Sequence, residues 1–244
     1  MRLTRPTYTH VCCMLYLHQA DVRKNDTICE LSLIIHSKFS PFIYLHQIVH
    51  KKEVFEYYVE HRQTAYITRD VIHTIIYNDL TDAARLVFQR GYYTVDWHFV
   101  DVAVRRRNER VLSVMIEYLG LQNYNRRGYQ GLLECITQHI TRLGFTDCVA
   151  TVLQTADYRT TVVLLSHSII HGRLDYVNMI LDSGSITVNT HKQHFYKAVK
   201  TGKYDIVKEF IRRGCDYSPK NVIRLHAQDD LQMQEILLRG NYYT

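Results

Sequence analysis

The sequence contains few of the residues that interrupt regular structure. Among its 244 residues are only 10 glycines and 3 prolines, which argues against collagen-like, linker-rich and turn-rich all-β chains. Apolar residues make up 46% and charged residues 22% of the chain, as is usual for folded globular proteins rather than disordered ones. No apolar run approaches the roughly 18 residues that a membrane span needs. We therefore expect one large or two small folded domains and no membrane span.

Paired cysteines and a secretion signal are also missing. The apolar stretch at residues 11–17 is followed by polar residues and by no small-residue cleavage site, so we expect no signal peptide and an intracellular location, in the cytoplasm or the nucleus. No CxxC spacing occurs, and buried free thiols are a better interpretation than a disulfide frame. The six cysteines are Cys12, Cys13, Cys29, Cys135, Cys148 and Cys215.

Motifs for catalysis and for nucleotide binding are absent as well. The chain has no GxxxxGK[ST], GxGxxG, HExxH or GxSxG pattern, and each of these patterns carries a specific chemistry. The 14 histidines and the cysteines do not show the converging ligand spacing of a structural zinc site. Nothing local marks a nucleophile beside a histidine and an acid. We therefore expect no catalytic residue, no metal, no cofactor and no enzymatic activity.

Glycine recurs within a repeated pattern. Residues 171–184 and 201–214 align without a gap, and a glycine opens each segment at its second position. Aspartate follows three residues after this glycine, apolar residues lie five, eight and nine residues after it, and a second glycine lies twelve residues after it. Positions five, eight and nine share one face of a helix, and a closing glycine is typical of a helix end. The pattern therefore predicts a tight turn, a helix and a second turn.

The same pattern recurs less completely along the chain, and a second apolar stretch of helical period precedes each anchor. One such helix pair cannot bury its own apolar face, so neighbouring pairs must stack. The sequence predicts an all-α solenoid of about seven helix pairs over residues 41–244, with a longer polar loop at 120–129 and degenerate capping helices in residues 1–40. The seven anchors are His50, Asn78, Arg107, Gly144, Gly172, Gly202 and Gln228.

This unit resembles the ankyrin repeat. The segment 198–202 is similar to that family's Ala-Ala-x-x-Gly turn, 214–216 to its Gly-Ala-Asp exit, and 185–189 to the segment after the exit. The family's Thr-Pro-Leu-His start is absent and the period is mostly 28 to 30 residues, against about 33 for a consensus repeat, so short loops should replace full β-hairpins. Tetratricopeptide and HEAT-like periods, about 34 and 40 or more residues, fit less well. Such eroded units resemble those encoded by large DNA viruses.

The resemblance implies a non-enzymatic interaction module. Ankyrin repeats bind proteins through their loop tips and the inner face of their first helices, and aromatic residues are favoured interface anchors. Such a module would bind, sequester or recruit a protein, which for a viral chain would be a host factor. The alternative for the aromatic residues is packing between neighbouring loops. The implied partner-binding residues are Tyr92, Tyr93, Asp96, Trp97, Tyr124, Arg126, Arg127, Tyr129, Ile186, His191 and Tyr217.

Basic clusters form a second candidate site. The net charge of +6 permits acidic partners, and the alternative reading is a set of solvated helix faces. Nucleic-acid binding is an alternative function that we do not favour, because dedicated nucleic-acid binders are usually more strongly basic. A structural component of a viral particle is the other alternative, and the partner and oligomeric state are left open. The candidate anion-binding residues are Arg105, Arg106, Arg107 and Arg110.

Overall fold

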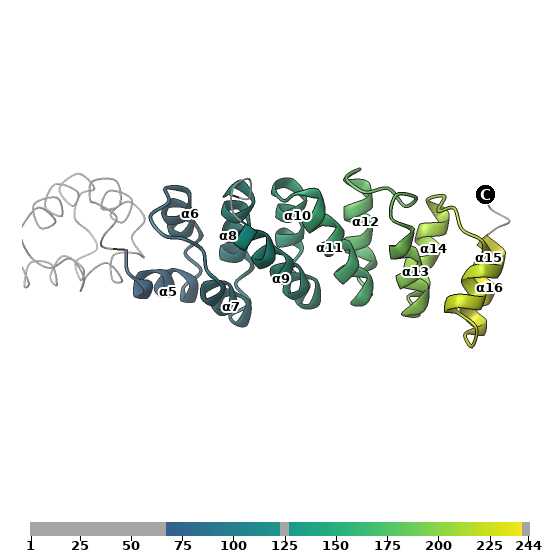
Figure 1. Ribbon diagram of the computed structural model, residues 1–244. Helices are drawn as coiled ribbons and strands as arrows, with labels where there is room; N and C mark the ends of the chain where they lie inside the picture. The colour runs from purple at the N-terminus through teal and green to yellow at the C-terminus, as the bar shows by residue number, and fades with distance from the viewer. Residues whose placement is uncertain (1–66, 123–126, 241–244) are drawn as a thin grey trace, which may run out of the picture. The chain divides into compact units, whose positions relative to one another are not determined.

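The computed structural model describes residues 67–122 and 127–240, without the side chains of 120–122 and 127–130. These residues form twelve α-helices and no strands (Figure 1), so the expected all-α class is confirmed for this part of the chain. The chain divides into two compact units, Met1–Thr94 and Val95–Thr244. The capping helices expected in residues 1–40 and the first helix pair, expected in 41–66, lie outside the described residues.

In the first unit, the described residues form one helix pair, α5 (Arg69–Tyr77) and α6 (Thr81–Gln89). The turn between the two helices has its left-handed residue at Asp79, with φ of 53°. The anchor is therefore Asp79 and not Asn78. With this correction, the glycine after α6 lies twelve residues beyond the anchor, as in the two segments that define the pattern. This glycine is Gly91, with φ of 69°.

The second unit contains ten described helices in five consecutive pairs. Every apolar stretch predicted within this range lies inside one of them, because its residues have the helical spacing that buries one face. The helices are α7 (Trp97–Arg105), α8 (Glu109–Gln122), α9 (Arg127–Leu143), α10 (Thr146–Thr155), α11 (Tyr158–Ile170), α12 (Leu174–Asp182), α13 (Lys192–Lys200), α14 (Tyr204–Arg212), α15 (Pro219–His226) and α16 (Leu231–Gly240).

The helices of the second unit form two layers. Each helix contacts the helix two places further along the chain, so α7, α9, α11, α13 and α15 form one row and α8, α10, α12, α14 and α16 form another (Figure 1). We call these the odd layer and the even layer. The core lies between them and contains fully buried large side chains such as Phe99, Tyr176, Phe195 and Phe210.

In the first four helix pairs of the second unit, the two helices are joined by a tight turn with one left-handed residue, whereas the turn between α15 and α16, at the predicted anchor Gln228, has none. At Gly172 and Gly202 φ is 68° and 64°, a conformation that glycine adopts without a Cβ penalty. Gly144 and Arg107 occupy the same place in two other pairs, with φ of 83° and 54°. The left-handed residues therefore lie at four of the predicted anchors.

The predicted bounds of the loop, 120–129, are wrong at both ends. Residues 120–122 continue α8, and α9 begins at Arg127. The physical reason is that glycine inside a helix costs only about 1 kcal/mol relative to alanine, so Gly120 does not end the helix. Gly240, the last glycine of the sequence, allows close packing. A Cβ at this position would approach Ile211 Cγ2 and Tyr217 Oη to 2.7 Å.

Candidate functional site: the odd-layer surface

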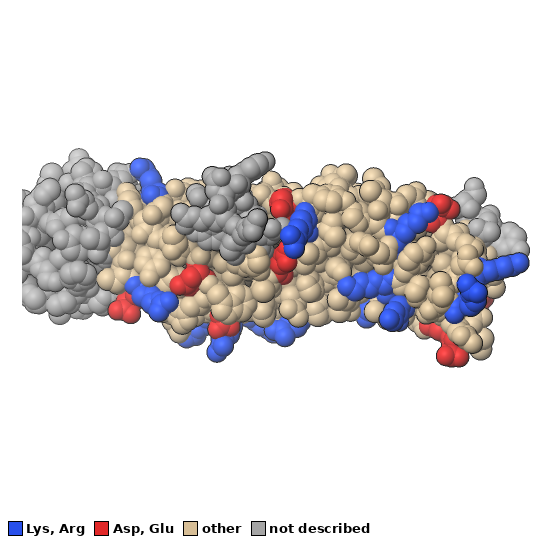
Figure 2. All heavy atoms as spheres, in the orientation of Figure 1, with Lys and Arg blue, Asp and Glu red and all other residues tan. Residues whose placement is uncertain are grey.

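Charge is divided unequally between the two layers in the last three helix pairs. The odd-layer helices α11, α13 and α15 contain no Asp or Glu. They carry six cations: Arg159, Lys192, Lys197, Lys200, Lys220 and Arg224. The even-layer helices α12, α14 and α16 instead carry five acids and three cations: Asp175, Asp182, Asp205, Glu209, Glu235, Lys208, Arg212 and Arg239. Figure 2 shows Lys and Arg side chains gathering on the part of the second unit where α13 to α16 lie.

Four of the odd-layer cations form what we call the cationic strip, namely Lys197, Lys200, Lys220 and Arg224. The last three are exposed and Lys197 is half-buried. Lys197 Nζ donates a hydrogen bond to Ser166 Oγ at 2.5 Å, and none of the four is ion-paired with a carboxylate of the described residues. Their charge is therefore uncompensated at the surface.

The other two odd-layer cations are paired. Arg159 Nε lies 3.1 Å from Glu134 Oε1 of α9, and Lys192 Nζ lies 2.7 Å from Asp216 Oδ2 in the segment before α15. Both pairs join successive helix pairs, so these cations connect neighbours. Among the six cations of α11, α13 and α15, the four of the cationic strip are therefore the ones left to attract a charge from outside the chain.

Ring contacts join neighbouring odd-layer helices. Trp97 of α7 lies 5.6 Å from His139 of α9 between ring centroids. Tyr196 of α13 stacks on His226 of α15 at 5.5 Å with an interplanar angle of 25°. Trp97 is 46% exposed, although tryptophan is usually well buried. This ring is thus a candidate interface anchor on the odd layer.

Tyr158 and His191 make a third ring contact. Their centroids lie 5.5 Å apart, and Tyr158 Oη and His191 Nε2 are hydrogen-bonded. Tyr158 is 51% exposed at the start of α11, and His191 is half-buried directly before α13. The predicted binding residue His191 therefore lies on the odd layer beside an exposed aromatic residue that sequence reasoning did not select.

The predicted partner-binding residues are divided between the two units. Tyr92 and Tyr93 belong to the first unit and are half-buried. Trp97 and His191 lie in the second unit. Tyr124 and Arg126 lie outside the described residues, and Arg127 and Tyr129 lie in α9 with side chains that are not described.

Three predicted binding residues instead support the fold. Ile186 is buried at 3% exposure, so it cannot anchor a partner. The side chain of Asp96 is the N-cap of α7, because its Oδ1 accepts a hydrogen bond from Phe99 N at 3.1 Å. Such a cap satisfies one of the free N–H groups of the first helical turn.

Tyr217 is the third predicted binding residue that supports the fold. Its ring lies 4.8 Å from that of Phe195, its hydroxyl donates to Leu237 O at 2.9 Å, and burial raises its pKa. For Tyr217, the alternative of aromatic packing between neighbouring segments is therefore the right one.

Three of the four arginines in the predicted anion site have interaction partners within the protein. Arg105 Nε lies 2.9 Å from Asp101 Oδ2, and Arg106 and Arg110 also have interaction partners. Arg107 is exposed, but it occupies the left-handed position of the turn. The cationic strip differs from this cluster because α13 and α15, the helices that carry it, contain no Asp or Glu. The sequence contained a signal for the cationic strip, because Asp and Glu are missing from the first helix of each of the last three pairs.

The interior contains thiols and a histidine that are unsuited to catalysis at neutral pH. Burial raises the pKa of Cys148, and it raises the pKa of Cys215 to about 11. Burial lowers the pKa of His194 to about 4, so this imidazole is neutral inside the fold. Cys135 is exposed, contrary to the expectation of a buried thiol. In the described ranges no three His, Cys, Asp or Glu residues are placed to hold a metal ion.

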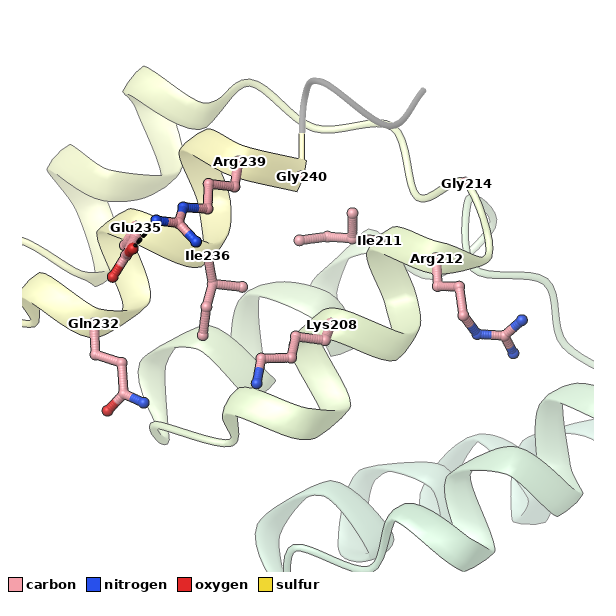
Figure 3. A pocket seen from close by; sticks show the side chains of 9 residues that line it. All are labelled: Lys208, Ile211, Arg212, Gly214, Gln232, Glu235, Ile236, Arg239 and Gly240. Atoms are coloured by element: carbon pink, nitrogen blue, oxygen red, sulfur yellow. Dashed lines mark ion pairs between the residues drawn. The ribbon is translucent and has the colours of Figure 1, made fainter.

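A groove of about 940 Å³ lies between α14 and α16 of the even layer. The side chains of Ile211 and Ile236 lie between the two helices (Figure 3). Its charges are compensated, in contrast to those of the cationic strip, because each cation of the rim pairs with an acid of its own helix. These pairs are Lys208 with Asp205 at 3.6 Å, Arg212 with Glu209 at 2.5 Å and Arg239 with Glu235 at 2.6 Å.

Comparisons with known proteins return no relative for this chain: no family model, no curated protein and no solved structure matches it. Among the helices of the described residues, none has both the length and the apolar character to cross a membrane.

Proposed function

We propose that the chain is an ankyrin-like helical-repeat solenoid that works as a non-enzymatic protein-interaction module, binding, sequestering or recruiting a partner protein inside the cell. The layered helix pairs and the glycine turns at a regular spacing support the repeat assignment. Were the likeness to viral ankyrin units to hold, the partner would be a host protein.

The odd-layer surface is the binding surface in this proposal. The observation that carries it is the combination of two exposed aromatic residues, Trp97 at 46% and Tyr158 at 51%, with cations that have no acidic partner among the described residues. Large exposed aromatic residues are common interface hot spots. Unpaired cations speed the approach of an oppositely charged protein and orient it.

Affinity capture followed by a measured dissociation constant tests this function. The full chain is used to recover partners from cell extract with nuclease present, and the recovered protein is titrated against Trp97→Ala with Tyr158→Ala. We expect the double variant to lose more than about 2 kcal/mol of binding free energy, as for hot-spot residues. The matched control is Leu238→Ala on α16, where Leu238 is 50% exposed. Equal affinity of the double variant and the wild type would reject the odd-layer surface as the interface.

A further inference from the structure

The cationic strip extends over two adjacent helices of the odd layer. Lys197 and Lys200 lie three residues apart on α13, and Lys220 and Arg224 lie four residues apart on α15. Residues at these spacings project from the same side of a helix. The two helices contact each other, and the Tyr196–His226 stack joins them. The strip is therefore two short rows of positive charge on neighbouring helices.

The spacing of the two rows fits an extended chain. Packed helices lie about 8–10 Å apart, and an extended chain of the polyproline II type advances about 3.1 Å per residue with three residues per turn, so that side chains three residues apart project from the same side. Acidic side chains about three residues apart would therefore meet one row and then the next. A segment of this kind needs no deep pocket, because the exposed ends of Lys200, Lys220 and Arg224 reach into solvent.

The surroundings of the strip favour a short acidic segment over a nucleic acid. Proteins that bind single-stranded nucleic acid stack bases on free aromatic faces, but one face of Tyr196, the residue before Lys197 on α13, already stacks on His226. The even-layer helices of the same two pairs, α14 and α16, carry three acids and three cations, so a long polyanion that continues past the strip would meet no further net positive charge there.

We propose that the cationic strip is the docking site for an acidic, Asp- and Glu-rich segment of the partner protein. This inference rests on the proposed function, and it adds the chemistry of the partner and the helices that recognise it. Contact with the strip replaces water around four cations that no carboxylate of the described residues neutralises, so binding must weaken as salt rises.

A direct binding assay tests the strip without knowledge of the cellular partner. The full chain is titrated against a fluorescein-labelled 12-residue polyglutamate peptide, and separately against a 12-nucleotide oligothymidine, by fluorescence anisotropy at about 50 and 200 mM salt, a range over which screening changes strongly. The test variant is Lys200→Glu with Arg224→Glu. The matched control is Lys208→Glu with Arg239→Glu on the even layer, which changes the net charge by the same amount.

We expect the test variant to weaken polyglutamate binding at least about tenfold and the control variant less than about twofold, as for rim charges in an interface. Equal loss in both variants would overturn the proposal, because net charge alone would then explain binding. Tighter binding of oligothymidine than of polyglutamate, or no polyglutamate binding by the wild type at low salt, would also overturn it. Lys200→Gln with Arg224→Gln repeats the test without introducing new negative charge.

The two proposals fail in different ways. If a partner is captured and its affinity is unchanged by Lys200→Glu with Arg224→Glu, the interaction module stands and the acidic segment is wrong. If no partner is captured while polyglutamate still binds to the strip, the proposed function fails and the charge recognition stands.

Discussion

The two layers of the second unit use charge in opposite ways. In the even layer, Glu209 accepts hydrogen bonds from Arg212 and Arg213 at 2.5 to 2.7 Å, and these arginines hold its pKa near 2. In the odd layer, Lys200 and Arg224 are exposed and have no acidic partner among the described residues. The comparison teaches that the even-layer charges stabilise the fold, while the cationic strip adds little to stability and is available for binding.

The largest effect on stability that we expect comes from the interior of the odd layer. His194 is buried at 3% exposure, and its pKa is lowered to about 4 by burial, His191 and Lys197. Because the unfolded chain takes up this proton near pH 6.5, stability is complete above that pH and falls as pH drops toward 4. The free energy of unfolding should decrease by about 2 kcal/mol between pH 7.5 and 5 from this group.

Urea unfolding at the two pH values measures this effect. His194→Leu removes the titrating group and should make the free energy of unfolding less dependent on pH over the same range. His226→Leu, at the surface stack with Tyr196, is the control. An unchanged pH dependence in His194→Leu would show that the buried imidazole does not drive it.

The next largest effect on stability comes from the even layer, and the same kind of substitution in the odd layer gives a direct comparison. Glu209→Ala removes the carboxylate that holds Arg212 and Arg213, and Arg213 also joins α14 to Asp182 of α12 at 2.8 Å. We expect a loss of about 1.5 kcal/mol in the free energy of unfolding, since hydrogen bonds to charged groups are among the stronger ones. Lys200→Ala, the odd-layer counterpart, should change it by less than about 0.5 kcal/mol. Chemical denaturation that finds the two losses equal would contradict the comparison.

The smallest effect on stability that we expect comes from a side chain of one helix pair that caps a helix of the next pair. Glu109 of α8 accepts hydrogen bonds from Asp147 N at 2.7 Å and Cys148 N at 3.4 Å at the start of α10. Helix α10 has no side-chain cap of its own. Glu109→Ala should therefore cost about 1 kcal/mol, as for other N-caps. Thermal unfolding measures this loss, and Glu109→Gln, which keeps an acceptor oxygen, should recover part of it.

Much of the helical architecture could be predicted from the sequence because its signals are local. The apolar spacing around Phe195 and the glycines at 172 and 202 mark helices and turns with little help from distant residues. The prediction failed at 120–129 because a glycine ends a helix only where the chain turns, and Gly120 lies within α8. The correct anchor in the first unit, Asp79, was missed because a non-glycine residue carries the left-handed turn there.

The candidate site was harder to predict because it depends on which segments meet. Ile186 and Tyr217 were selected as loop-tip anchors, but Ile186 is buried and the half-buried Tyr217 packs against Phe195. Linear charge clusters drew attention to Arg105 and its neighbours, whereas Asp101 pairs with Arg105 one turn away. Along the chain, α14 of the even layer separates the two helices of the cationic strip. It becomes one surface only when α13 and α15 lie side by side.

Zero-length carbodiimide cross-linking tests the central claim most directly, because it joins a lysine amine to a carboxylate in contact with it. The full chain is cross-linked to the captured partner, and the joined peptides are identified by mass spectrometry. The account predicts cross-links at Lys197, Lys200 and Lys220 of the odd layer and few at Lys208, which is exposed on the even layer. Cross-links concentrated at Lys208, with the odd-layer lysines unmodified, would contradict it.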